Sequence, residues 1–121
     1  MPNGPNPPEF VSSIPRNGAT GVSLNPRIQL TFSNDVTNDS VWDNNRTQIR
    51  LFRGSVRVGI RVTRSASEAL RRLIFVRPIN TLRPLTNYRL VILPGLTANN
   101  GLQLGETVTI RFRTTSEIPE E

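Results

Sequence analysis

The sequence predicts an all-β protein, folded as one antiparallel β-sandwich of Greek-key type with about seven strands. Apolar and polar residues alternate with a period of two along most of the chain, which is typical of strands with one buried and one exposed face. Ten Pro and eight Gly among 121 residues indicate frequent turns. No long helical period is present, and the length suits a single domain.

The predicted strands follow from this alternation. It is clearest where Ile28, Leu30 and Phe32 are separated by polar residues. The same pattern predicts strands at residues 10–14, 28–32, 49–51, 56–62, 73–76, 88–92 and 108–113. Turn sequences lie between them, namely Asn17-Gly18, Thr20-Gly21, Gly54-Ser55 and Asn99-Asn100-Gly101. One short helical turn is predicted at residues 38–43, beginning at a capping Asn.

The two ends of the chain differ from this body. Residues 1–8 and 116–121 are rich in Pro, Asn and Glu and show no apolar alternation, so we interpret them as linkers flanking a domain at residues 9–115. A body between two linkers suggests a module of a longer protein. No apolar run reaches the roughly 18 residues of a membrane span, and no signal peptide is recognised, so membrane insertion is not expected.

Composition argues against an enzyme. The chain has no His and no Cys, which removes imidazole bases, thiol nucleophiles, zinc fingers and disulfides. No phosphate-binding loop or nucleophile elbow is present, and we expect no catalytic residue, cofactor or metal. Acidic and amide residues between 34 and 45 could offer oxygens to calcium. They lack the spacing of an EF-hand loop, and we interpret them as turn and cap residues.

The charge is strongly uneven. The net charge is +6, all fifteen basic residues are Arg, and residues 46–113 carry thirteen Arg against two acids. The alternation predicts that Arg57 and Arg61 share one face of their strand and that Arg111 and Arg113 share one face of theirs. Such a positive plate could bind an acidic polymer through bidentate contacts. The alternative, which we favour, is that exposed Arg discourages strand pairing between molecules.

Nucleic acid is not an expected partner of this plate. Binders of single strands place aromatic rings among their basic residues. Six of the seven aromatic residues are expected in the core or at a corner of the sandwich, away from the arginines. Trp42 is the exception, and it falls in the predicted short helix.

A resemblance to a known family appears at four places. The residues Ile14-Pro15-Arg16-Asn17-Gly18-Ala19-Thr20-Gly21-Val22 resemble the "P-x-[ND]-G-A-x-x-V" opening of bacterial Ig-like domains of S-layer and other surface proteins. The strand ending Thr31-Phe32-Ser33 is similar to the family's "tFS". The stretch from Pro78 to Leu82-Arg83-Pro84-Leu85-Thr86-Asn87-Tyr88 resembles its "P…L-x-P-x-t-x-Y" corner, and Phe112-Arg113-Thr114 its terminal "F-x-T". The likeness covers residues 8–115.

The resemblance implies an Ig-like fold and a structural, spacer or adhesion-type role in a larger bacterial surface or secreted protein. The module would be extracellular, non-catalytic and monomeric, with the neighbouring domains of its chain as partners. The alternative is a binding module whose Arg-rich face holds an acidic cell-wall or extracellular polymer. The high Arg content and the lack of Lys depart from the family pattern.

Tyr88 is interpreted as a structural residue. A Tyr at the start of the penultimate strand of a sandwich can place its ring in the core and bond its hydroxyl to a backbone group of the preceding loop. We expect Leu82 to close the same end of the core and Pro84 to stiffen the loop.

Overall fold

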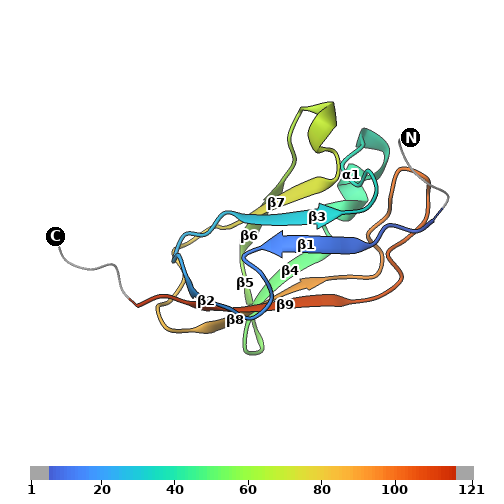
Figure 1. Cartoon of the computed structure of the whole chain (residues 1–121). Coiled ribbons are helices and arrows are strands. Elements are labelled where there is room, and N and C mark those ends of the chain that lie inside the picture. Colours follow the sequence, from blue (N-terminus) through green and yellow to red (C-terminus); the bar gives the residue numbers. More distant parts are fainter. Residues whose placement is uncertain (1–5, 117–121) are drawn as a thin grey trace.

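Residues 6–116 of the computed structural model are described here, and they form two β-sheets packed face to face (Figure 1). One sheet has four strands in the order β1-β3-β7-β6, and the other has five in the order β2-β9-β8-β4-β5. The elements are β1 (Phe10–Ile14), β2 (Ala19–Val22), β3 (Ile28–Phe32), α1 (Asp39–Asn45), β4 (Ile49–Arg53), β5 (Val56–Val58), β6 (Ile60–Thr63), η1 (Glu68–Leu70), β7 (Leu73–Pro78), β8 (Asn87–Ile92) and β9 (Val108–Thr114). This order confirms the all-β, Greek-key sandwich.

Residues 6–116 contain nine strands, two more than the sequence analysis predicts. One addition comes from the segment 56–62, which is not one strand: β5 belongs to the five-stranded sheet and β6 to the four-stranded sheet. The chain crosses between the sheets at Gly59, whose carbonyl accepts a hydrogen bond of 3.0 Å from the Ile79 amide. A Cβ at Gly59 would lie 3.2 Å from the Ile79 Cδ1, so a larger residue would crowd this crossing.

The alternation hides this crossing for a physical reason. Val58 lies opposite Leu51 in one sheet, and Val62 lies opposite Val76 in the other. Both valines therefore face the interior, because the inner faces of the two sheets meet there. An unbroken period of two cannot distinguish one strand from two strands that face each other.

The second additional strand is β2, where the Thr20-Gly21 pair suggests only a turn. It pairs with β9 in parallel, whereas all other strand pairings among residues 6–116 are antiparallel. The predicted antiparallel sandwich therefore carries one parallel edge. The register of β2 shifts between Ala19 and Val22, and an irregular strand of four residues gives little periodic signal.

The core lies between the sheets and reaches both ends of the sandwich. Its centre is formed by inward-facing strand residues such as Leu30, Leu51 and Leu90, which are fully buried. The whole cluster comprises Ile28, Leu30, Phe32, Val36, Ile49, Leu51, Ile74, Val76, Leu82, Tyr88, Leu90, Ile92, Leu96, Leu104, Ile110 and Phe112. The predicted positions of Leu82 and Tyr88 in the core are thus confirmed.

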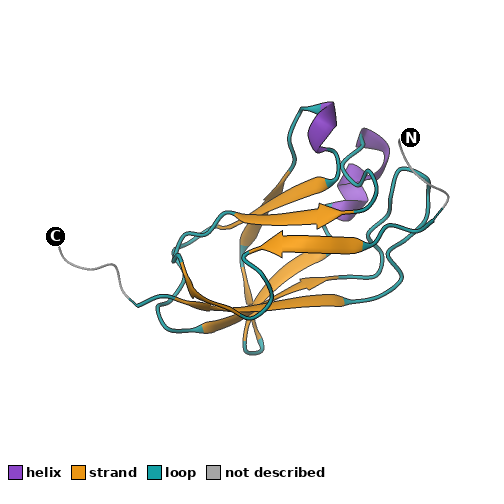
Figure 2. Cartoon of the chain, viewed as in Figure 1, coloured by secondary structure: helices purple, strands orange, loops and turns teal. Residues whose placement is uncertain are grey.

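In the described part of the chain, helical structure is confined to one end of the sandwich, where α1 and η1 lie together (Figure 2). The predicted helical turn is confirmed: Asn38 caps α1 by accepting a hydrogen bond of 3.0 Å from the Ser40 amide. The single turn η1 has no counterpart in the sequence analysis. Neither helical segment of the described chain has the length and hydrophobicity to cross a bilayer.

The chain enters the sandwich at this helical end and leaves it at the opposite end, where β9 finishes (Figure 1). At the entrance, the Asn6 carbonyl accepts hydrogen bonds of 3.0 Å from the side chains of Asn34 and Asn100. Pro8, in the same stretch, is buried. The predicted linkers at 1–8 and 116–121 fall largely outside the described residues, so these boundaries stay a prediction.

The predicted corner at Tyr88 is present. Its hydroxyl accepts a hydrogen bond of 2.9 Å from the Arg83 amide, and its ring stacks on Phe112 with the centroids 5.7 Å apart. The buried Thr114 strengthens the corner, because its hydroxyl donates to the Arg83 carbonyl and accepts from the Thr86 amide at 2.9 Å. The family-like residues Tyr88, Thr86 and Thr114 therefore tie the loop before β8 to the end of β9.

Replacing Tyr88 with Phe should lower the free energy of unfolding by about 1–3 kcal/mol without changing the fold. The substitution keeps the ring, which is only 3% exposed, but leaves the Arg83 amide without its acceptor. Chemical denaturation monitored by circular dichroism measures the change. An unaltered midpoint would show that the corner hydrogen bond does not contribute to stability.

Candidate functional site

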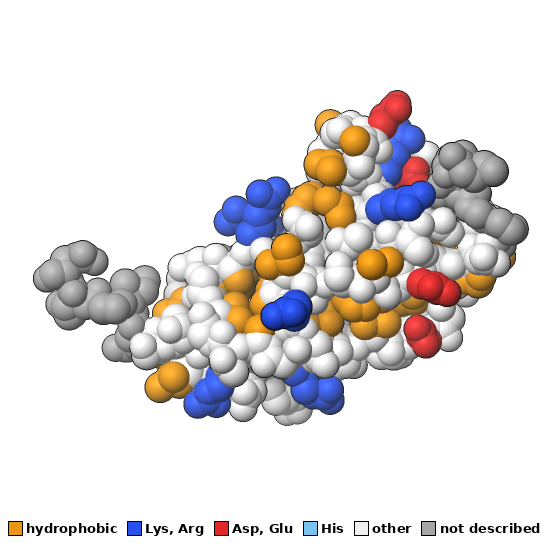
Figure 3. Space-filling view, viewed as in Figure 1, with side chains coloured by type: hydrophobic (Ala, Val, Ile, Leu, Met, Phe, Trp, Pro, Cys, Tyr) orange, Lys and Arg blue, Asp and Glu red, His pale blue; other side chains and the backbone are white. Residues whose placement is uncertain are grey.

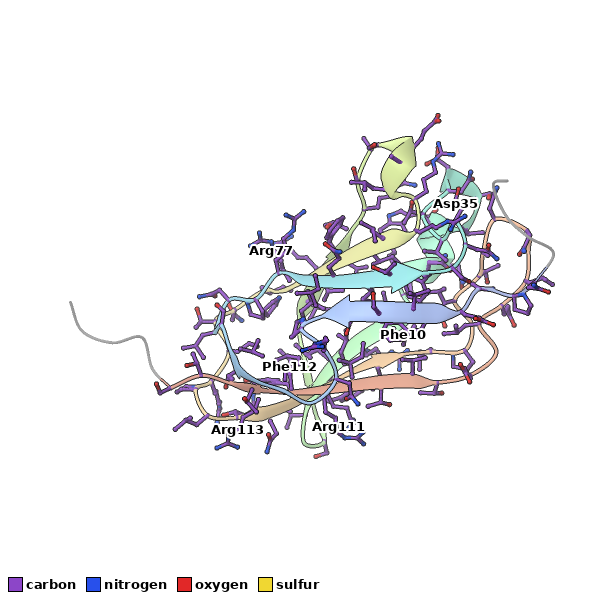
Figure 4. All side chains as sticks on the ribbon, viewed as in Figure 1. Phe10, Asp35, Arg77, Arg111, Phe112 and Arg113 are labelled. Carbon is purple, nitrogen blue, oxygen red and sulfur yellow. The ribbon has the colours of Figure 1, made fainter. Side chains whose placement is uncertain are left out.

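The outer face of the five-stranded sheet carries a row of arginines. Arg111 of β9 lies opposite Arg89 of β8, Arg89 lies opposite Phe52 of β4, and Phe52 lies opposite Arg57 of β5. Directly opposed residues share one face of a sheet. Arg113 is on the same face, two residues beyond Arg111. In Figure 4, Arg111 and Arg113 point away from the sandwich, whereas Phe112 between them points into it.

The predicted pairing of Arg57 with Arg61 on one strand face is wrong. Arg57 lies on the outer face of the five-stranded sheet, while Arg61 lies in β6 opposite Arg77, on the outer face of the other sheet. The crossing at Gly59 separates them. Both residues line a shallow depression of about 360 Å³ at the sandwich edge between β5 and β6. The predicted common face of Arg111 and Arg113 is confirmed.

A groove of about 340 Å³ lies over β8 and β9 and gathers part of this row; we call it the β8–β9 groove. Its polar side chains include Arg89, Arg111 and Arg113, and it contains no acidic residue. The start of β2 and the β4–β5 hairpin contribute the remaining lining. The complete lining is Gly18, Ala19, Thr20, Gly54, Asn87, Tyr88, Arg89, Arg111, Phe112 and Arg113.

The Asn17-Gly18 pair of the family-like opening holds the start of β2 beside the groove. The Asn17 side-chain oxygen accepts a hydrogen bond of 2.8 Å from the Arg111 amide. The Gly18 amide donates one of 2.6 Å to the Arg111 carbonyl. Gly18 adopts a φ of 87°, a conformation that residues with a Cβ rarely tolerate. The turn sequence therefore fixes the backbone of Arg111 from one side.

Arg89 is held in place on the opposite side of the groove. Its guanidinium lies 4.7 Å from the centroid of the Phe52 ring, and it donates a hydrogen bond of 3.5 Å to the Gly54 carbonyl. A cation over an aromatic face is attracted by the ring quadrupole. The hairpin, predicted at Gly54-Ser55, thus also orients an arginine of the groove.

Of the six aromatics expected in the core or at a corner, Phe52 lies instead on the outer face beside the arginines, and Phe75, although buried, lies beneath an arginine. Phe52 shares the outer face with Arg57 and Arg89, because Leu51 and Ile49 take the inward positions of β4. Phe75 lies opposite Gln29 on the outer side of the other sheet, where Arg27 covers its ring at 4.5 Å. A guanidinium group covers each ring and partly shields it from water. The position of each Phe in its strand, rather than its hydrophobicity, therefore determines that it faces outward.

The ion pairs of the described chain lie at the helical end. Arg64 pairs with Asp39 at 2.8 Å, and the longer pairs there are Arg46–Asp43, Arg71–Asp35 and Arg71–Glu68 at 3.6–3.9 Å. Within residues 6–116, no ion pair forms with the groove arginines or Arg57. In the view of Figure 3, the acidic side chains lie toward the right of the molecule, and the basic side chains along the lower margin have no acidic neighbour on the visible face. The groove therefore keeps its positive charge.

The acidic and amide residues between 34 and 45 are structural, as predicted. Asp35 accepts hydrogen bonds of 3.2 Å from the amides of Thr37 and Asn38. Asn45 is fully buried and bonds to the backbone of Val36 and Thr97. Within residues 6–116, no three acidic side chains gather closely enough to hold a metal ion.

Two sheets with this strand order, closed by a tyrosine corner, define an Ig-like β-sandwich module. The chain belongs to the bacterial Ig-like domain family, whose model matches residues 5–114. The resemblance stated from the sequence is therefore correct. No curated protein matches the sequence.

Solved structures show the same fold. Domains 1–6 of the surface layer protein SbsC give a TM-score of 0.63 at 18% identity, and the match covers 96% of this chain and 15% of that one. PcoC, a copper resistance protein from Escherichia coli, gives a TM-score of 0.61 at 18% identity, and the match covers 88% of this chain and 98% of PcoC. An L,D-transpeptidase from Mycobacterium smegmatis gives a TM-score of 0.58 at 16% identity, and the match covers 91% of this chain and 41% of the transpeptidase. The chain thus spans a small part of the surface layer protein.

The likeness to PcoC is one of fold and does not extend to copper ligands. PcoC is described as methionine-rich. This chain contains one Met, at position 1, and no His or Cys. Thioether, thiolate and imidazole groups are the ligands that copper prefers, so the residues of this chain do not fit such a site.

Proposed function

We propose that the chain is a non-catalytic structural module that spaces neighbouring domains within a larger, extracellular bacterial surface protein. The observation that carries this proposal is the position of the chain ends: the domain is entered at its helical end and left at the opposite end (Figure 1). Modules built in this way extend when joined in series, which suits a spacer. The bacterial Ig-like family and the likeness to SbsC domains support the surface location.

The parallel pairing of β2 with β9 suits a module that transmits force. When the two ends of the domain are pulled apart, β2 and β9 are drawn in opposite directions along their axes. The hydrogen bonds between these segments, such as those from Gly18 to Arg111 and from Thr115 to Val22, are then loaded together. Hydrogen bonds that are loaded together withstand a larger pulling force than hydrogen bonds that break one after another.

Single-molecule force spectroscopy tests this role. The chain has no Cys, so handles can be attached at introduced cysteines. We expect Glu9→Cys with Ser116→Cys, which pulls from opposite ends, to unfold at about twice the force of Ser23→Cys with Ser116→Cys, because several backbone hydrogen bonds must break together in the first case. The second pair peels β2 from β9, since both handles lie at the same end of parallel strands. Equal forces would contradict a load-bearing spacer.

Binding of an acidic cell-wall or extracellular polymer is the second candidate function. The observation that favours it is the set of arginines on one sheet face, Arg57, Arg89, Arg111 and Arg113, which form no ion pair within residues 6–116. Arg61, on the other sheet, is not part of this face. The module would act as a monomer in either function.

A further inference from the structure

We propose that the β8–β9 groove is a binding site for a phosphodiester polymer with a flexible polyol backbone. This proposal deepens the second candidate function and rests on it, and it is independent of the spacer role. It assigns binding to Arg89, Arg111 and Arg113, with Asn87 and Thr20 beside them. Arg57 shares the sheet face but lies outside the groove.

The spacing of the three arginines suits closely spaced anions. Arg111 and Arg113 are two residues apart on one strand, which corresponds to about 7 Å. Arg89 is directly opposite Arg111, at about 5 Å between Cα atoms. A guanidinium presents parallel N–H groups that match the two free oxygens of a phosphodiester. Successive phosphates of a polyol phosphate chain, separated only by a short carbon bridge, can meet successive arginines.

Two parts of the groove are held in place by the protein itself. The backbone of Arg111 is fixed by Asn17 and Gly18, and the Arg89 side chain is held between the Phe52 ring and the Gly54 carbonyl. Little conformational freedom of these groups is then lost on binding, which favours affinity. Like charges directly opposite in a sheet are destabilising, so an anion between Arg89 and Arg111 relieves a repulsion present in the free protein.

The lining of the groove selects against polymers that depend on stacking. Its two aromatic residues, Tyr88 and Phe112, point into the core and are each 3% exposed. The nearby Phe52 ring is covered by Arg89. A nucleic acid base would find no free ring to stack on, although stacking supplies much of the affinity of single-strand binders. A flexible polyol phosphate loses nothing by this absence.

The test measures binding of three probes by titration calorimetry near 0.15 M salt, where exposed charges more than about 8 Å apart are largely screened. The probes are a glycerol phosphate oligomer, an oligogalacturonate of equal charge and a single-stranded DNA of equal charge. We expect the glycerol phosphate oligomer to bind most tightly. Arg111→Gln with Arg113→Gln should weaken this binding at least about tenfold, as loss of charge-assisted hydrogen bonds requires.

A matched control removes the same charge from the other sheet. Arg61→Gln with Arg77→Gln should leave the affinity within about twofold, since these residues lie far from the groove face. Arg111→Lys with Arg113→Lys keeps the charge and should still weaken binding several-fold, because Lys lacks the guanidinium fork. Thermal melting of each variant verifies that it is folded.

Each outcome decides a different point. Equal losses in the groove and control variants would show that net charge alone attracts the polymer, which overturns both the groove and the assignment of polymer binding to the outer face of the five-stranded sheet. Equal or tighter binding of DNA or oligogalacturonate would overturn the polyol phosphate assignment. If no probe binds, both the groove site and the polymer-binding function are wrong, while the force measurement still decides the spacer role.

Discussion

Asn45→Ala should destabilise the protein by about 3–5 kcal/mol, since each buried polar group left unmet costs about 1–3 kcal/mol. Asn45 has no exposed surface. Its side-chain amide donates hydrogen bonds of 2.7 Å to the carbonyls of Val36 and Thr97, and its oxygen accepts one of 2.8 Å from the Thr97 amide. The substitution removes these three hydrogen bonds at once, together with one of 3.1 Å that the Asn45 oxygen accepts from the Asn44 side chain. One side chain thus joins α1 to two connections at the helical end.

Asn44 provides the matched control in this prediction. It precedes Asn45 in α1, and its exposed side chain donates hydrogen bonds of 2.8 Å to the Gly95 carbonyl and of 3.1 Å to the Asn45 side-chain oxygen. Asn44→Ala should cost about 0.5–1.5 kcal/mol, because water can replace an exposed partner. Urea denaturation of both variants measures the difference. Similar losses for the two would mean that the buried bonds of Asn45 contribute no more than a surface hydrogen bond.

Phe32→Ala should have an effect of similar size, about 3–5 kcal/mol, through the cavity it creates in the core. The Phe32 ring is 1% exposed and meets Phe10 edge to face, with the centroids 6.0 Å apart. Its removal takes away the aromatic contact between β1 and β3, while their backbone pairing remains. Because β1 is the first strand of the domain, we also expect the variant to exchange the amide hydrogens of β1 faster.

Phe52→Ala is the control for this prediction, because it removes the same kind of ring from a position outside the core. Phe52 lies on the outer face of β4, where it is partly exposed and touches Arg89. Phe52→Ala should cost about 1 kcal/mol, the usual scale of a change outside the core. Chemical denaturation compares the two variants by their midpoints, provided that the free energy of unfolding depends on denaturant concentration with the same slope in both. A loss at Phe52 as large as that at Phe32 would contradict the assignment of the two rings to outer and inner faces.

The amino-acid sequence by itself determined the fold class and the local devices that close it. Alternation located β3, β8 and β9 correctly, because each is one regular strand bounded by turn or loop residues. The corner formed by Tyr88 and the cap formed by Asn38 could be recognised, because each depends on partners within five residues. Short-range hydrogen bonds of this kind can be predicted from local sequence patterns.

Only the tertiary structure decided which arginines meet. Alternation gives the face of a strand but not its sheet, so Arg57 and Arg61 could not be separated before the crossing at Gly59 was known. The groove depends on Asn17 bonding to Arg111, which lies 94 residues later in the chain. Such contacts arise because the two sheets must bury a common core. Contacts between residues so far apart produce no periodic pattern in the sequence from which they could be predicted.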